Sequence, residues 1–343
     1  MSAGAPAPAY SVRPGDVVAD REAVLAIWRG NLGVEARMAR KFDWFYAAAP
    51  QGAPLMQLLV HAGTEAPVGT CSAGRRRMCL GTQVLEAGVL VDLAVTPEHR
   101  SLGPALMLQQ GLFNAGRAQL DLLYGFPNPK AVPVFKRIGY RALGQMERHV
   151  RVVRHAPYFA RRIPAPLASV AGALFDAFDA LARVVRTRLR ATWHDRVPDD
   201  ADALCSGAPR PEAVTAERTP ASLRWRFDAA PDARFRHLVL ADRDGPVAWF
   251  ATRRDDHILH VHDYWTRDGA LASRAHLDGL LAAARRAGAA AVSIELASIG
   301  SLLHPWREAG FTVRSARPVF GWCGIAHGDA AVPLHLVSAD EDE

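Results

Sequence analysis

The segment 89–108, VLVDLAVTPEHRSLGPALML, constrains this chain more than any other stretch. It reads as a β-strand, a short turn that contains glycine, and the first turns of a helix. Arg100, Gly103 and Ala105 have the spacing R-x-x-G-x-A. A strand that leads through such a turn into a helix points backbone N–H groups at one spot, and the positive end of the helix dipole adds to them. The segment therefore predicts a cradle for a pyrophosphate group.

The same segment resembles the central strand and acetyl-CoA loop of the GNAT acyltransferase superfamily. That motif usually reads V-x-P-E-x-R-G-x-G-x-G/A, and its positions are held here by Val95, Pro97, Glu98, Arg100, Gly103 and Ala105. Ser101 replaces a glycine that often follows the arginine, and Pro104 lacks an N–H where many relatives offer one. The alternative is an ordinary strand–turn–helix unit, but the length of the match favours the cofactor loop.

The stretch downstream has the element order that this resemblance implies. Residues 103–118 carry an apolar stripe of helical period, 121–126 form a short apolar run before a turn, and Gly139 is placed to end a short helix. GNAT proteins read N-x-x-A-x-x-x-Y-x-K-x-G-F in this region, and that spacing is matched here by Asn128, Ala131, Phe135, Gly139 and Tyr140.

Phe135 stands where many relatives have a tyrosine whose hydroxyl protonates the departing CoA thiolate. Phenylalanine has no proton to give, so either the thiolate leaves without that acid or another group supplies it. Tyr124 and Tyr140 are near in sequence and are the candidates. The alternative for each is a buried aromatic residue with a satisfied hydroxyl.

Upstream, residues 19–33 have the pattern of an amphipathic helix, and 55–60 and 66–71 read as strands separated by a polar turn. The stretch from about 10 to 153 is therefore expected to follow the order β-α-α-β-β-β-α-β-α-β. That order would complete one GNAT domain.

Short matches between the two halves of the chain keep the same order, which indicates an internal repeat. The segment 44–50, WFYAAAP, resembles 225–231, WRFDAAP, and 135–140, FKRIGY, resembles 306–311, WREAGF. We predict an α/β (α+β) fold of two GNAT-like domains, each with a mixed central sheet flanked by helices. The second copy has no R-x-x-G-x-G/A turn, so it is expected to keep the fold and lack the pyrophosphate site.

The predicted boundaries give an N-terminal GNAT domain at 1–155, a helical connector at 156–200, a degenerate GNAT-like domain at 201–330 and an acidic tail at 331–343, whose last residues are expected to be disordered. Apolar residues recur at helical spacing within 167–185, with arginines on both sides. One interpretation is an amphipathic helix in weak contact with an anionic membrane surface, and the other is a helix packed on both domains.

The charge and cysteine content narrow the class of protein. The formal net charge is +6, and the excess comes almost wholly from scattered arginines. It suits an anionic cofactor and forms no basic patch interleaved with aromatic residues, so we expect no nucleic-acid partner. The four cysteines have no CxxC spacing and no export signal is visible, so we expect reduced thiols and a cytoplasmic protein. The oligomeric state does not follow from the sequence.

His260 and His262 fall on one face of an expected strand, just after Asp255 and Asp256. A metal site would need further ligands that the sequence does not locate, so no metal is expected. The favoured interpretation is a strand face that lines the cleft between the domains. Neutral imidazoles there could contact substrate or relay a proton.

In GNAT proteins the central strand separates from its neighbour, and its free backbone groups bind the pantetheine arm and polarise the thioester carbonyl. The resemblance assigns that role here to Leu93 and Val95. It assigns the pyrophosphate to a run of residues at the turn and helix start, namely Arg100, Ser101, Leu102, Gly103 and Ala105. It places Asn128 on the far side of the pantetheine.

Asp92 and Glu86 are the acidic residues nearest in sequence to the reacting centre. A base that takes a proton from an ammonium works best with a raised pKa or through a water molecule. Asp92 could be that base, or it could be a strand-end residue bonded to the backbone. Both interpretations stay open, and the counterpart of Asp92 in the second copy is Asp263.

Two functions compete at this point. The resemblance implies an N-acyltransferase that uses acetyl-CoA or another acyl-CoA as donor and a small-molecule or sugar-like amine as acceptor. The alternative is a GNAT-like protein that binds acyl-CoA, or a partner, without catalysis. Phe135, Pro104 and the degenerate second half motivate that alternative.

Overall fold

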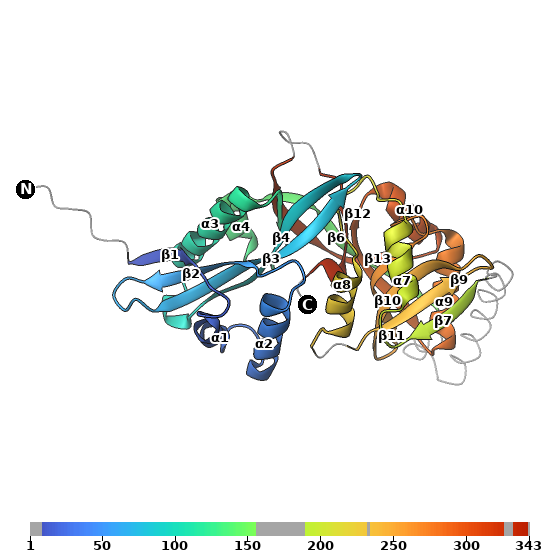
Figure 1. Cartoon of the computed structure of the whole chain (residues 1–343), viewed down its shortest axis with the longest axis horizontal. Coiled ribbons are helices and arrows are strands. Elements are labelled where there is room, and N and C mark those ends of the chain that lie inside the picture. The colour runs from blue at the N-terminus through green and yellow to red at the C-terminus, as the bar shows by residue number, and fades with distance from the viewer. Residues whose placement is uncertain (1–8, 156–188, 232–233, 326–331, 342–343) are drawn as a thin grey trace, which may run out of the picture.

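The computed structural model describes residues 9–155, 189–231, 234–325 and 332–341. Figure 1 shows an elongated molecule in which the first half of the chain forms one end and the second half the other. The expected connector helix within 167–185, and with it the membrane-surface contact, lies outside the described residues.

The first half follows the expected order of helices and strands. Its elements are β1 (Tyr10–Pro14), α1 (Arg21–Trp28), α2 (Glu35–Phe42), the π-helical turn η1 (Asp43–Ala47), β2 (Leu55–His61), β3 (Pro67–Leu80), β4 (Gln83–Val95), the 3₁₀ turn η2 (Pro97–His99), α3 (Leu102–Gln119), β5 (Leu122–Gly125), α4 (Val132–Ile138) and β6 (Arg141–Val152). The helix α1 is shorter than expected because the chain turns at Gly30, which has a φ of 74°.

The second half repeats that order. Its elements are β7 (Arg190–His194), α7 (Asp199–Gly207), β8 (Thr215–Ala216), α8 (Pro220–Leu223), the π-helical turn η3 (Arg224–Asp228), β9 (Arg236–Ala241), β10 (Pro246–Asp255), β11 (Ile258–Thr266), α9 (Arg274–Arg286), β12 (Ala291–Ser298), α10 (Gly300–Glu308), β13 (Thr312–Cys323), β14 (His335–Val337) and the 3₁₀ turn η4 (Ser338–Asp340). The predicted α/β class is confirmed. The repeat begins with β7, which is inside the stretch expected to be connector.

The two halves exchange a strand at the centre of one continuous sheet. The described strands run in the order β1-β2-β3-β4-β5-β13-β6-β12-β11-β10-β9-β7, with β8 and β14 off this path. Thus β13 of the second half lies between β5 and β6, and β6 of the first half lies between β13 and β12. Neither half completes its own sheet, so the expected boundary at residue 155 does not separate two independent sheets.

A pair of tryptophans from matching positions of the repeat marks the junction of the halves. Trp44 of η1 and Trp225 of η3 are both buried, and their rings stack with 4.8 Å between centroids. Each indole N–H donates to the other residue's backbone carbonyl, at 2.9 and 3.0 Å. This reciprocal contact is what two related copies give when the same residue meets itself across a pseudo-two-fold axis.

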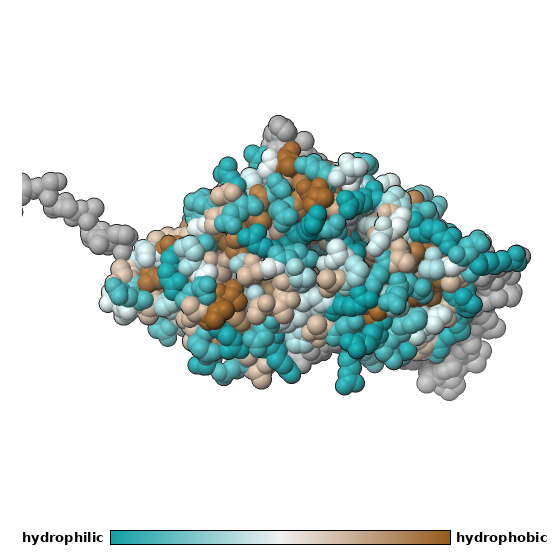
Figure 2. All heavy atoms as spheres, in the orientation of Figure 1, coloured by the Kyte–Doolittle hydropathy of each residue, from teal (hydrophilic) through white to brown (hydrophobic). Residues whose placement is uncertain are grey.

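The helices of the first half cover both faces of its sheet. The helices α1 and α2 pack on one face through buried residues such as Val24, Trp28 and Phe42, and this core continues to Trp225 of the second half. The helices α3 and α4 pack on the other face, where Leu108 is among the buried residues. The surface in the view of Figure 2 is mostly hydrophilic, with apolar residues in separate groups. Across the described ranges, no helix is long and apolar enough to span a membrane.

The C-terminal segment is ordered through residue 341, which corrects the expectation of a disordered acidic end. One edge of β12 carries β6, and the other edge carries β11 and then β14, which pairs Val337 with Leu296. The gap where β11 leaves β12 is therefore filled by the chain's own C-terminal strand. The acidic composition predicted disorder, but Leu336 and Val337 are completely buried, and Asp340 is only 4% exposed.

Candidate active site

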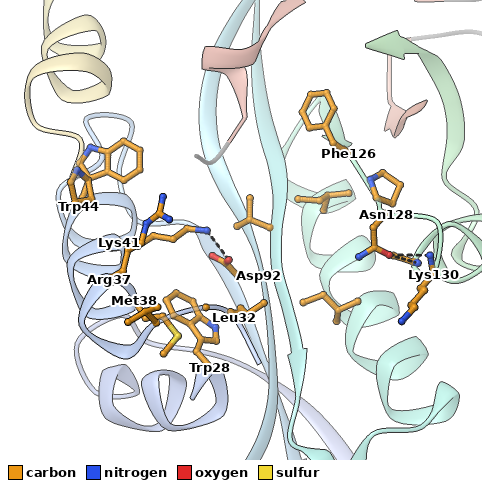
Figure 3. A pocket seen from close by; sticks show the side chains of 18 of the residues that line it. Trp28, Leu32, Arg37, Met38, Lys41, Trp44, Asp92, Phe126, Asn128 and Lys130 are labelled. Atoms are coloured by element: carbon orange, nitrogen blue, oxygen red, sulfur yellow. Dashed lines mark hydrogen bonds and ion pairs between the residues drawn. The ribbon is translucent and has the colours of Figure 1, made fainter. Parts of the chain in front are cut away.

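The strands β4 and β5 separate in the middle of the first half, as the resemblance implied. They pair in parallel only from Ala87 to Val89 on β4. Beyond Val89 no described strand covers this edge of β4, and a cavity of about 940 Å³ opens there. Its walls come from α1, α2 and the second half on one face of the sheet, and from α3, α4 and the end of β5 on the other. The cavity thus connects the two faces through the gap (Figure 3).

Asp92 lies on β4 at this gap in an unusual backbone conformation. The pairing of β3 with β4 shifts between Thr70 and Ser72, so that Asp92 and Leu93 together oppose one residue of β3. Asp92 has a φ of 54°, which is costly for a residue with a Cβ in a strand. Such strain collects at functional sites, where a bulge can aim one side chain. Here it turns the carboxylate toward α2 (Figure 3).

The Asp92 carboxylate is held by two side chains from the same face. Lys41 Nζ lies 2.8 Å from one oxygen, and the Tyr46 hydroxyl donates to the other at 2.9 Å. The side chains of Lys41 and Asp92 are 17% and 6% exposed. An ion pair this sheltered is screened less by solvent than a surface pair.

The predicted pyrophosphate turn lies beside the α3 end of the cavity, and of its predicted residues only Arg100 belongs to the lining. Ser101 is the extended residue before α3, and Ser101, Leu102 and Gly103 are exposed. The start of a helix offers unpaired N–H groups, and Pro104 removes one of them at its third residue. Arg100 lines the cavity and donates a hydrogen bond to Asn31. A Cβ added to Gly103 would meet no atom within 4 Å, so this turn has open space in front of it.

Asn128 also lines the cavity, but its side-chain oxygen is engaged. It accepts hydrogen bonds of 3.0 Å from the backbone N–H groups of Lys130 and Ala131, just before α4. These bonds shape the turn and leave the amide NH₂ as the group that a pantetheine arm could contact. Phe135 of α4 is buried and lines the cavity too.

Seven predicted site residues are not part of the cavity lining. Four belong to the turn and helix start, Ser101, Leu102, Gly103 and Ala105, and the other three are Tyr124, Glu86 and Val95. Tyr124 is completely buried in the core on the α1 and α2 face, where its hydroxyl donates to the Asp340 backbone oxygen at 2.8 Å, and burial raises its pKa well above the usual range. Glu86 precedes the gap, on the β3–β4 hairpin, and its side chain is exposed there. Val95 pairs with Gly69 and packs in the α3 core. The sequence distances were short, but strand alternation and the direction of β4 carry these side chains elsewhere.

The histidine pair lies one layer behind the cavity instead of lining it. His262 is half-buried against the Phe235 ring and near the Ser338 hydroxyl, 3.3 Å from Nδ1. Burial lowers its pKa to about 3, and nearby arginines add to the effect. The pKa of His260 is lowered by burial as well. Within the described ranges no group of three or more His, Cys, Asp or Glu side chains could hold a metal.

Several cavity residues were missed by the sequence analysis. Arg37 and Lys41 stand four apart on α2, a spacing that puts both on one helical face, but nothing in the sequence tied that face to β4. The second half contributes Arg226, Phe235 and Arg253. Only the packing of the two copies brings these residues to the first copy's gap.

No protein-family profile matches the chain, and no curated protein matches it in sequence. Solved structures do match. A protein of unknown function from Enterococcus faecalis, described as a probable N-acyltransferase, has a TM-score of 0.66 at 10% identity, covering 92% of this chain and 73% of its own. GCN5-related N-acetyltransferases from Anabaena variabilis and Kribbella flavida have TM-scores of 0.62 and 0.57 at 12% identity; each covers 92% of this chain, and 73% and 71% of its own.

These likenesses show the fold alone, because the sequence identities are low. The chain has the fold of the GCN5-related N-acetyltransferases, in two intertwined copies. The predicted resemblance is confirmed at that level. The gap between β4 and β5, the helix start beside it and the strained Asp92 are the features of the site that the fold positions.

Proposed function

We propose that this protein is an acyl-CoA-dependent N-acyltransferase, with acetyl-CoA as the simplest donor and a small-molecule amine as acceptor. One observation carries the proposal. The cavity runs through the sheet at the gap between β4 and β5, with Arg100, just before the start of α3, at one end and Asp92 at the other. A thioester threaded through the gap would meet an amine approaching from the α2 face.

The donor's phosphates fit the α3 end. The start of α3 supplies N–H groups and the positive end of its dipole, and Gly103 leaves room for close approach. Arg100 and Lys130 add positive charge where the cavity reaches this face. The unpaired edge of β4 near Leu93 offers backbone groups to the pantetheine amides and to the thioester carbonyl. A well-placed donor to that carbonyl contributes about 3 kcal/mol to the stability of the tetrahedral intermediate.

The chemistry is the attack of a neutral amine on the thioester carbonyl. The C–N bond forms, the C–S bond breaks as the tetrahedral intermediate collapses, and CoA departs as its thiolate, while the proton that the amine loses passes to the Asp92 carboxylate. Asp92 is the carboxylate nearest this point, and we assign it the role of binding the acceptor amine. Lys41 and Tyr46 hold the Asp92 carboxylate in place. Phe135 gives no proton, and a thiolate is stable enough to leave without one.

The proposal is tested by turnover. The full chain is supplied with acetyl-CoA and a panel of small amines, and thiol release is followed together with the mass of the acylated product. Gly103→Glu should abolish turnover because its carboxylate opposes the phosphates. The matched control is Gly207→Glu, since Gly207 is exposed at the end of α7 and its Cβ would also meet no atom within 4 Å. Binding of acetyl-CoA without turnover of any amine would instead support a non-catalytic protein.

A further inference from the structure

The cavity carries an excess of positive charge. Its lining includes six basic side chains, Arg37, Lys41, Arg100, Lys130, Arg226 and Arg253, and a single carboxylate, Asp92. Asp92 is already paired with Lys41. The net charge of the lining is therefore strongly positive, and an occupant without negative charge would leave it uncompensated.

The basic residues fall into two groups by the elements that carry them. Arg100 and Lys130 lie with α3 and α4, where the donor's phosphates are placed by the proposed function. The other four lie with α2 and the second half. Arg226 stands over the Trp44 ring at 5.6 Å, and Arg226 and Arg253 both lower the pKa of His262. A single acyl-CoA threaded through the gap would place its phosphates near the first group. The second group would then have no anion to bind.

Two residues of the second group are not committed to a partner. Arg226 is buried and donates to the Ser338 carbonyl, and Lys41 is paired with Asp92. Arg37 of α2 and Arg253 of β10 are exposed at the cavity, and among the described residues neither forms an ion pair. Exposed arginines are common on solvated surfaces. These two differ because they come from separate halves of the chain and border one cavity.

We propose that the acceptor is an amine that also carries an anionic group, a carboxylate or a phosphate, bound by Arg37 and Arg253. This inference rests on the proposed function. The acceptor's amine would lie at Asp92, and its anion would lie toward the two guanidinium groups. Lys41 would add positive charge near both. Arginine forms paired hydrogen bonds with both carboxylate and phosphate oxygens. Amines with several positive charges are disfavoured by the same surface.

The test compares acceptors that differ only in the anion. Amino acids are paired with their amides, and amino sugar phosphates with the free amino sugars, and kcat/KM is measured for each with saturating acetyl-CoA. We expect the anionic member of at least one pair to be preferred by about tenfold or more, as for a charge-assisted hydrogen bond. The two pairs distinguish a carboxylate acceptor from a phosphate acceptor.

Variants locate the preference. In the double variant Arg37→Gln/Arg253→Gln, the ratio of kcat/KM for anionic over neutral acceptor should fall toward one. Arg243→Gln removes the same charge from the exposed β9–β10 turn and should keep the ratio of the parent. An unchanged ratio in the double variant would overturn the inference, and so would equal or better use of the neutral members.

The failure of this inference and that of the proposed function give different results. Turnover of neutral amines alone, or of polycationic amines, would overturn the anionic acceptor while leaving an N-acyltransferase. Turnover of no anionic amine in either pair also overturns it. Failure of the parent chain to bind acetyl-CoA in calorimetry would overturn the proposed function, and the acceptor inference with it.

Discussion

At the scale of single residues, Asp92 and its counterpart Asp263 occupy matching positions of the repeat but have different surroundings. Asp92 has a strained backbone and a partly exposed lysine partner at the cavity. Asp263 is buried and bonded to Arg218, with 2.7 Å between the nearest atoms and both side chains about 5% exposed. Arg218 in turn stands over the Trp265 ring at 4.4 Å. The second carboxylate is part of a buried ion pair, and the first is the one for which we propose a role in the chemistry.

This difference predicts opposite effects of one substitution. Asp263→Asn leaves a buried guanidinium without its charge partner, which costs about 3–5 kcal/mol of folding stability. Asp92→Asn leaves Lys41 without its charge partner, but Lys41 is 17% exposed and can be solvated in part, so we expect a smaller loss of stability than for Asp263→Asn and a large loss of turnover. Urea unfolding and kcat on both variants check this. Equal loss of stability with unchanged kcat for the folded Asp92→Asn protein would make Asp92 a scaffold residue.

At the scale of elements, β14 distinguishes the second copy from the first. It fills the gap between β11 and β12 that corresponds to the cavity of the first copy. The missing turn after β11 is the reason that the sequence analysis expected no pyrophosphate site in the second copy. The filling strand was not predicted, because the acidic residues around it dominate the composition of the segment. The burial of three apolar or neutral residues, His335–Val337, stabilises this strand in spite of the acidic residues around it.

The burial of His335 makes this element sensitive to acid. Its Nδ1 lies 2.8 Å from the Ser298 hydroxyl, and burial lowers its pKa to about 3. The unfolded chain, with a histidine pKa of about 6.5, binds the proton first, so the contribution to stability is complete above that pH and is lost as the pH falls toward 3. The loss is roughly 1.4 kcal/mol for each pH unit below about 6.5.

Melting temperatures between pH 8 and pH 5 test this prediction. His335→Gln should be less stable than the parent at neutral pH and should lose less stability on acidification. His304→Gln is the control, since the His304 side chain is 70% exposed on α10. Parallel acid profiles for the parent and His335→Gln would contradict the prediction.

At the scale of the whole molecule, the exchange of β6 and β13 joins the two copies into one folding unit. The sequence predicted the order of elements through the first half, since the periodic pattern and the turn residues are local. It did not predict the exchange. The pattern of β13 fits pairing with β6 in either arrangement, and its insertion beside β5 depends on contacts far apart in the chain. For the same reason the cavity residues of α2 and the second half escaped the sequence analysis.

The exchange predicts that the first half does not fold by itself. A chain ending at residue 155 lacks β13, so it exposes the edges of β5 and β6 and loses the Trp44–Trp225 contact. We expect no cooperative unfolding of that fragment in urea, and recovery when residues 156–343 are coexpressed. A fragment 1–155 that unfolds cooperatively at the urea concentration of the full chain would contradict the exchange.

The central claim is that the chain holds one acyl-CoA site, in the gap of the first copy. A calorimetric titration of the full chain with acetyl-CoA tests it most directly, because it gives the stoichiometry together with the affinity. We predict one site per chain, lost in Gly103→Glu and retained in Gly207→Glu, since β14 occupies the second gap. Two sites per chain, or normal binding by Gly103→Glu, would contradict this account.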